Sequence, residues 1–194
     1  SDGFELGDMS NTTADHAVSM EISAAEGVEV MRGPETLAYG SNTIAGIINI
    51  ITPFKNLKKL SSTNYKLLFG HESSNQSNLI GSDVNIPLND YQLAISLNNR
   101  STNDQSSPIG TLENTALEKN DLTLNLTKFG EKDLITIELK DFSMDYGIPG
   151  SPEGHIDGVD LALKNQTQKL KYHSDIKFMS FNILDLEQGY VRYG

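Results

Sequence analysis

The sequence of 194 residues contains no cysteine and no tryptophan. Without cysteine, the chain can form neither a disulfide framework nor a thiolate metal site. The longest apolar stretch runs from Ile44 to Ile51 and includes Gly46 and Asn49, which is far short of the roughly 18 residues that a membrane helix needs. The formal net charge is −11, so we expect no nucleic acid partner.

The sequence also lacks the signatures of export and of catalysis. Its first ten residues carry neither a basic segment nor an apolar core, so no signal peptide is expected within it. Either the protein is not exported, or the sequence begins downstream of the start of a longer protein. We find no nucleophile elbow, no phosphate-binding glycine-rich loop and no HExxH pattern. We therefore expect no enzymatic activity and no prosthetic group.

From about residue 62 the sequence alternates between apolar and polar residues. The run from Tyr91 to Leu97, for example, places Leu93 and Ile95 between Gln92, Ala94 and Ser96. Such alternation is typical of strands with one apolar and one polar face. It predicts seven strands, near residues 64–71, 77–86, 90–100, 120–129, 133–143, 165–174 and 178–187.

The connections between these predicted strands alternate in length. The turns at 87–90 and 130–132 are tight, whereas residues 101–119 and about 144–164 form long polar loops. Outer-membrane β-barrels have short turns on one side and longer loops on the other. The short connection at about 72–76 departs from this pattern, and soluble antiparallel sheets also combine alternating strands with polar loops. The strands alone leave both folds open.

Residues 28–52 have a different pattern. A short β-like run at Val28 and Val30 is broken at Gly33-Pro34, and about one helical turn follows, closed by Gly40. An apolar strand with a single polar interruption, Asn49, comes next.

This segment resembles the plug-domain signature of TonB-dependent outer-membrane receptors. In that family a strand ends in Arg-Gly-Pro and is followed by Tyr-Gly, and then by Gly and an apolar strand with Asn and Thr near its end. The corresponding residues here are Arg32, Gly33, Pro34, Tyr39, Gly40, Gly46, Asn49 and Thr52. The resemblance implies a mainly β protein of the bacterial outer membrane, in which a transmembrane antiparallel β-barrel of about 22 strands surrounds an α+β plug.

Because about seven strands cannot close around a plug, we expect a fragment of such a receptor. Residues 1–53 would be the C-terminal part of the plug, and residues 54–194 the first strands of the barrel. The resemblance further implies three partners, namely membrane lipid, a TonB-type energy-coupling protein whose binding segment lies outside this sequence, and a metal ion or metal complex.

Two segments carry candidate metal ligands. Asp15 and His16 lie in a polar stretch that is similar to the outward loop of the plug in the zinc-uptake branch of the family. Glu153, His155 and Asp157 lie in an acidic loop rich in glycine and proline. Carboxylate and imidazole groups suit Zn²⁺. The alternatives are a turn-capping aspartate beside a solvated histidine in the first segment and a solvated acidic loop in the second.

Arg32 and the histidines complete the set of candidate residues. An arginine that ends a buried plug strand is costly unless it is paired, and the resemblance implies that Arg32 anchors the plug to the barrel. Gly33, Gly40 and Gly46 are expected to serve backbone geometry. The expected topology places His16, His71 and His155 near the outer side, whereas His173 falls near the periplasmic side.

The leading hypothesis is therefore energy-coupled uptake of a metal, with zinc favoured as the transported ligand. A siderophore or haem receptor of the same family is the nearest alternative, although the predicted outer loops hold few aromatic or arginine residues apart from Tyr146 and Arg100. A soluble β-rich binding module is the alternative from another class of protein.

Overall fold

A computed structural model describes much of the chain. The described residues are 25, 27–34, 36, 46–52, 57–151, 156–175 and 184–193. The chain divides into two compact units, Ser1–Lys59 and Leu60–Gly194, and each is described here by itself.

The described part of the first unit is a two-stranded antiparallel sheet. Its strands are β1 (Gly27–Met31) and β2 (Ile47–Ile51), paired with Gly27 opposite Ile51. A short 3₁₀ turn follows β1, and the Thr36 hydroxyl donates a hydrogen bond to the carbonyl oxygen of Gly33 at 2.8 Å. Gly33 has a φ of 78°, a left-handed conformation that glycine adopts without a steric penalty.

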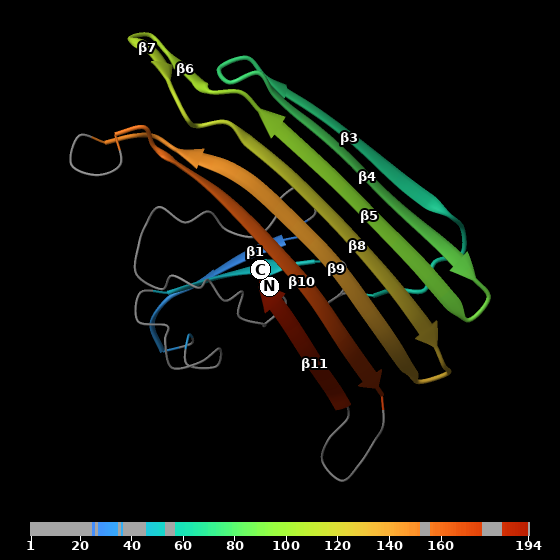
Figure 1. Cartoon of the computed structure of the whole chain (residues 1–194). Helices are drawn as coiled ribbons and strands as arrows, with labels where there is room; N and C mark the ends of the chain where they lie inside the picture. Colours follow the sequence, from blue (N-terminus) through green and yellow to red (C-terminus); the bar gives the residue numbers. More distant parts are fainter. Residues whose placement is uncertain are drawn as a thin grey trace. The chain divides into compact units, whose positions relative to one another are not determined.

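The second unit is built on one antiparallel sheet (Figure 1). Its seven strands are β3 (Asn64–Glu72), β4 (Ser77–Leu88), β5 (Tyr91–Thr102), β8 (Leu117–Phe129), β9 (Asp133–Ile148), β10 (Val159–Ser174) and β11 (Leu184–Tyr193). Their spatial order is β11-β10-β9-β8-β5-β4-β3. Two short strands, β6 (Gln105–Ser107) and β7 (Gly110–Leu112), form a separate hairpin between β5 and β8.

The prediction of a mainly β protein with an antiparallel sheet is confirmed. All seven strands overlap their predicted ranges. Residues 178–183 of the seventh range lie outside the described residues, and β11 is described as Leu184–Tyr193. Within the described residues β3 and β11 are edge strands, so the sheet is not closed.

Two predicted loops are shorter than expected. The segment 101–119 contains β6, β7 and the start of β8, and the segment 144–164 contains the end of β9 and the start of β10. In β9 the apolar residues change face here, from Ile137 and Leu139 to Phe142 and Met144. The alternation of apolar and polar residues that marks a strand in the sequence is therefore interrupted at Lys140 and Asp141.

The connections of the sheet lie at two ends. At the distal end are the connections 73–76, 103–116 and 149–158; at the proximal end are 89–90, 130–132 and 175–183. Residues 176–183 of the last connection lie outside the described residues. The alternation of short and long connections holds only in part, because the distal connection 73–76 is short.

The register of the sheet aligns residues of neighbouring strands so that cross-strand partners point to the same face. Ile95 on β5 lies opposite Leu124 on β8, which lies opposite Leu139 on β9. One residue further along, Ser96 lies opposite Thr123, which lies opposite Lys140. Since side chains alternate between faces along a strand, this register separates the sheet into an apolar face and a polar face.

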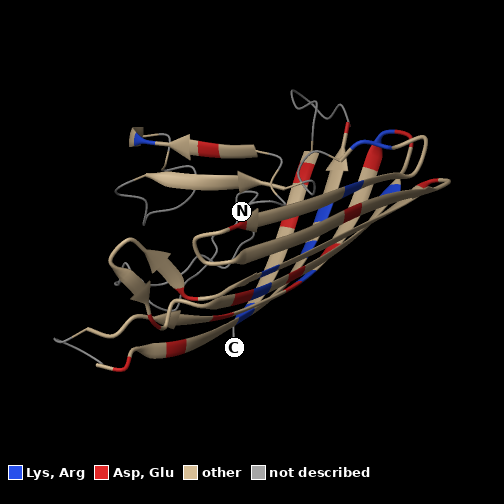
Figure 2. Cartoon of the chain, turned by 90° about the horizontal axis from the view of Figure 1, so that it is seen from above, with Lys and Arg blue, Asp and Glu red and all other residues tan. Residues whose placement is uncertain are grey.

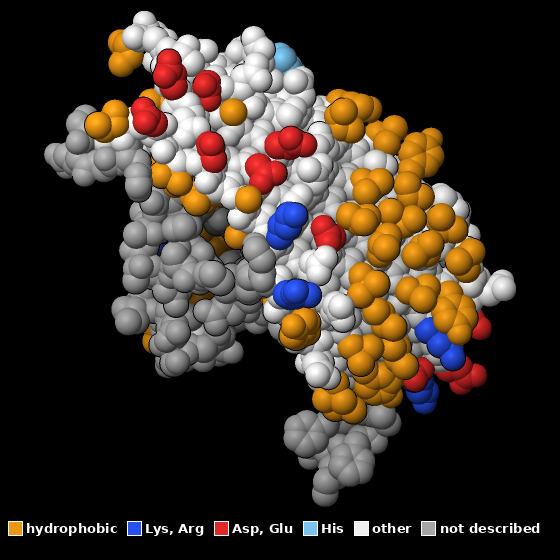
Figure 3. Space-filling view, in the orientation of Figure 1, with side chains coloured by type: hydrophobic (Ala, Val, Ile, Leu, Met, Phe, Trp, Pro, Cys, Tyr) orange, Lys and Arg blue, Asp and Glu red, His pale blue; other side chains and the backbone are white. Residues whose placement is uncertain are grey.

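The apolar face is exposed. Its exposed large hydrophobic residues are Tyr65, Leu67, Phe69, Ile80, Leu88, Tyr91, Leu97, Leu122, Leu126, Ile135, Ile137, Leu139, Leu170, Leu184, Leu186 and Tyr190. Figure 3 shows hydrophobic side chains covering the sheet towards the proximal end, with acidic side chains gathered towards the distal end. In the described part of this unit, the only fully buried hydrophobic residues are Phe142 and Met144.

Because the chain has no native cysteine, disulfide trapping tests the register directly. Ile95→Cys with Leu124→Cys places the two cysteines opposite each other, where Cα atoms are about 4.5–5.5 Å apart and a disulfide can form. We expect nearly complete cross-linking under mild oxidation, measured by a shift in non-reducing electrophoresis. The control pair, Ile95→Cys with Leu126→Cys, is offset by two residues and should cross-link poorly. The opposite ranking of the two pairs would contradict the register.

Candidate functional site

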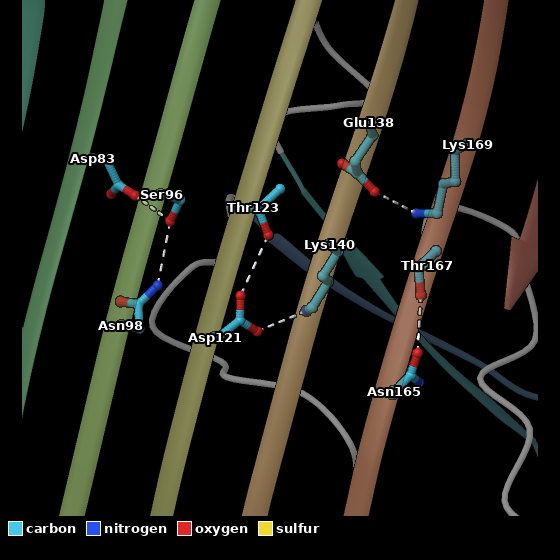
Figure 4. Close-up of polar contacts among 10 residues, drawn as sticks. All are labelled: Asp83, Ser96, Asn98, Asp121, Thr123, Glu138, Lys140, Asn165, Thr167 and Lys169. Atoms are coloured by element: carbon cyan, nitrogen blue, oxygen red, sulfur yellow. Dashed lines mark hydrogen bonds and ion pairs between the residues drawn. The ribbon is translucent and has the colours of Figure 1, made fainter. Parts of the chain in front are cut away.

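The polar face of the sheet is buried, which is the reverse of an ordinary soluble sheet. Its buried residues are Gln92, Asn98, Asp121, Asn125, Thr127, Thr136, Glu138, Asn165, Thr167, Lys169 and Lys171. Four adjacent strands, β5, β8, β9 and β10, contribute them. Polar groups in such a place are as a rule hydrogen-bonded or paired. Figure 4 draws contacts of this kind, whereas Asn125 Oδ1 is buried without a hydrogen-bond partner among the described residues.

Two ion pairs lie at the centre of the polar face. Lys140 Nζ is 2.7 Å from Asp121 Oδ2, and the side chains of these residues are 18% and 1% exposed. Lys169 Nζ is 3.2 Å from Glu138 Oε1, with side chains 6% and 4% exposed. The first pair joins β9 to β8, and the second joins β10 to β9. Charges this deeply buried require partners because removing one leaves the other desolvated and unpaired.

Hydroxyl and amide groups extend the contacts on either side. The Ser96 hydroxyl donates to Asp83 Oδ1 at 2.6 Å, and Asn98 Nδ2 donates to Ser96 Oγ at 3.2 Å. The hydroxyls of Thr127 and Thr136 are 2.9 Å apart on neighbouring strands.

Further ion pairs lie towards the edges of the sheet. Lys171 contacts Glu187 at 3.4 Å, and Lys66 contacts Asp83 at 3.9 Å. Figure 2 shows basic and acidic positions lying next to each other along the strands. Charge on the polar face is therefore largely balanced by pairs that cross between neighbouring strands.

Of the predicted metal ligands, only Asp157 lies within the described residues. It is exposed in the connection 149–158 at the distal end. Asp15, His16, Glu153 and His155 lie outside the part of the chain that the structure describes. In the described part, no group of three or more histidine, aspartate or glutamate residues could hold a metal ion.

The residues of the predicted plug signature are described only in part. Arg32 and Pro34 are exposed, and Tyr39 and Gly40 fall outside the described residues. Gly46 has a φ of 130°, and a Cβ there would come within 3.0 Å of the Met31 carbonyl oxygen. Gly46 therefore serves backbone geometry, as predicted for this position.

Asn49 is the polar interruption in the apolar strand β2, and it is buried. It lies opposite Glu29 on β1, and its Nδ2 donates to Glu29 Oε2 at 3.0 Å. The side chain thus joins the two strands of the sheet, which explains why a polar residue is tolerated there.

The two described histidines lie at opposite ends of the sheet. His71, near the distal end, has Nδ1 3.0 Å from Asn78 Oδ1. His173, near the proximal end, has Nδ1 2.6 Å from Asp185 Oδ1 and Nε2 3.4 Å from Asp175 Oδ1. Because these carboxylates face opposite nitrogens of one imidazole ring, the three residues do not converge on a shared metal position.

Sequence reasoning missed the ion pairs of the polar face. Glu138 occupies a polar position of the alternating run from Ile135 to Leu139, and Lys140 directly follows the run, two residues after Glu138, so their place on one face could be inferred. Their partners Lys169 and Asp121 could not be chosen without the register between the strands.

No protein-family model matches the sequence. Among the described residues, no helix is long and apolar enough to cross a membrane.

The buried Asp121–Lys140 pair can be tested by mutation. Lys140→Met leaves Asp121 buried without its cation, which should lower the free energy of unfolding by about 3–5 kcal/mol. Adding Asp121→Asn should restore part of this loss. Denaturant unfolding followed by circular dichroism measures both effects.

The matched control is Lys66→Met. This residue pairs with Asp83, but its side chain is 60% exposed, so the change should cost no more than about 1 kcal/mol. Equal losses for Lys66→Met and Lys140→Met would contradict the burial of the central pair.

Proposed function

We propose that this chain is part of a TonB-dependent outer-membrane receptor for energy-coupled uptake of a metal. Residues 54–194 would form N-terminal strands of a transmembrane β-barrel, and residues 1–53 the C-terminal part of its plug. The observation that carries the proposal is the reversed burial of the sheet, in which the hydrophobic side chains are exposed and the polar and charged ones are buried.

The reversed burial favours a bilayer as the surroundings of the apolar face. Each large hydrophobic side chain forgoes about 1.5–3 kcal/mol when it is left in water instead of being buried. A soluble antiparallel sheet packs its apolar face on a core and turns its polar face to water. A membrane barrel does the opposite, with its apolar residues facing lipid and its polar residues facing the lumen.

The dimensions and ends of the apolar face agree with this proposal. A tilted strand needs about 9–11 residues to cross a bilayer, and β5 and β8 have 12 and 13. At the proximal end Tyr91 lies on the apolar face, with Lys128 Nζ 5.9 Å from its ring centroid. Tyrosine and lysine suit the membrane–water interface, where their polar groups stay hydrated.

The apolar face becomes polar before the strands reach their distal ends. Beyond Leu97 and Leu122, the next residues on this face are Asn99 and Asn120, which are joined by a side-chain hydrogen bond of 2.8 Å. Strands that continue past an apolar band would extend into water at the outer side of the membrane.

The plug signature and the candidate metal ligands supply the rest of the proposal. The substrate would be Zn²⁺, held at the outer side by some of Asp15, His16, Glu153, His155 and Asp157. Coupling to a TonB-type protein would move the plug, and release requires that the two plug states bind the metal differently. A siderophore or haem complex is the alternative substrate within the same family.

The absence of tryptophan allows a fluorescence test of the lipid-facing side. Leu124→Trp places a reporter on the apolar face, and Thr123→Trp places one on the polar face. In vesicles of brominated lipid, we expect emission of the first variant to fall by more than half and that of the second to change little. Stronger quenching at position 123, or a chain that stays monodisperse without detergent, would instead support a soluble binding module.

Calorimetric titration with zinc tests the proposed substrate. We expect the protein to bind Zn²⁺, and Asp15→Ala and His16→Ala each to weaken binding about tenfold or more. Binding should also weaken at pH 5.5, because a protonated imidazole cannot act as a ligand. Asp90→Ala at the proximal end is the control. Unchanged affinity in both test variants would remove these residues from the metal site.

A further inference from the structure

At the distal end of the sheet, hydrogen bonds link the connections 73–76 and 103–116, and tie the second of them to the strand ends that flank the connection 149–158. Asn103 N donates to the Asn75 carbonyl oxygen at 2.8 Å, and Ser106 N donates to that of Ser74 at 2.9 Å. Asn103 Nδ2 also donates to Gln76 Oε1 at 2.9 Å. The connection 103–116 is therefore tied to the turn 73–76.

Within the connection 103–116, one carboxylate fixes the segment before β8. Asp104 Oδ1 accepts hydrogen bonds from the backbone nitrogens of Thr115 and Ala116 at 2.8 and 3.0 Å. The Thr115 hydroxyl accepts a further bond from Gln105 N at 2.7 Å. These contacts hold the preceding residue, Asn114, close to β9 and β10.

Asn114 bridges the last residue pair of β9 and β10. Its Nδ2 donates to the carbonyl oxygens of Ile148 and Val159 at 2.9 and 3.2 Å, and these two residues lie opposite each other at the end of the ladder. Asn114 itself has a φ of 58°, a left-handed conformation in which asparagine is enriched. One amide group therefore contacts both strands that lead into the connection 149–158.

Two glycines make room for this amide. A Cβ at Gly147 would lie 2.4 Å from Asn114 Oδ1, and a Cβ at Gly158 would lie 2.5 Å from Asn114 Nδ2. Any larger residue at these positions would displace the Asn114 side chain.

We propose that Asn114 is a positioning residue that clamps the strand ends at Ile148 and Val159 to the connection 103–116. The proposal has a second part, which rests on the proposed function. Because Asp157 lies two residues before Val159, the clamp holds a candidate zinc ligand in place from a different loop.

Hydrogen–deuterium exchange of the protein in detergent micelles tests the clamp. Asn114→Asp keeps the shape of the side chain but replaces the donor with a carboxylate that repels the two carbonyl oxygens. Asn114→Gly keeps the left-handed backbone accessible and removes the amide. In both variants we expect peptides covering residues 144–151 and 156–162 to exchange at least tenfold faster, while peptides from the middle of β5 and β8 keep their protection.

The matched control is Asn85→Asp. Asn85 Nδ2 also donates to a side chain, Asn64 Oδ1 at 2.9 Å, but it lies on β4, away from the distal connections. Exchange at 144–162 should be unchanged in this control. Unchanged exchange there in both Asn114 variants would overturn the clamp.

Zinc titration of the same proteins separates the two parts of the proposal. We expect both Asn114 variants to bind Zn²⁺ about tenfold more weakly than the unaltered protein. Faster exchange with unchanged zinc affinity would overturn the positioning role towards the metal. If the unaltered protein binds no zinc, the proposed substrate is wrong, whereas the clamp is still decided by the exchange measurement.

Discussion

The structure of the second unit depends on one constraint, the register between its seven paired strands. This register keeps the side chains of each face aligned from one strand to the next. In the middle of the sheet the pairings match apolar positions with apolar ones and polar positions with polar ones, as in Ile95 with Leu124 and Ser96 with Thr123. Phe142 opposite Asp121 and Leu139 opposite Gln168 are exceptions. A shift of one residue in any pairing would move a whole strand's side chains to the wrong face. The buried ion pairs depend on the same constraint, because Asp121 meets Lys140 only when β8 and β9 keep this register.

The two faces make opposite demands on the surroundings of the sheet. The exposed hydrophobic face calls for an apolar medium, and the buried charged face calls for cross-strand partners. A lipid bilayer outside and a polar interior satisfy both demands together. The edges of the sheet add a third demand. Among the described residues β3 is an edge strand with exposed hydrophobic side chains, and such an edge favours association with another strand.

The sequence allowed the strands to be predicted where one of their faces is apolar. The run Tyr91–Leu97 is an example, because its alternation shows both the strand and its two faces. The end of β9 could not be found in this way, since its apolar residues change face between Leu139 and Phe142. The cross-strand partners could not be predicted either, because the sequence allows Glu138 to pair with any lysine. Only the register places Lys169 opposite it. The role of Asn114 could not be predicted from the sequence, because its contacts with β9 and β10 depend on the conformation of the loop.

The central claim is that the apolar face of the sheet meets lipid. Single nitroxide labels placed in turn from Tyr91 to Arg100 on β5, in protein reconstituted into bilayers, test it most directly through their collision rates with molecular oxygen, which concentrates in hydrocarbon. The account predicts a period of two, with high rates at residues 91, 93, 95 and 97 and low rates at the intervening positions. High rates at 92, 94 and 96, or rates without periodicity, would contradict it.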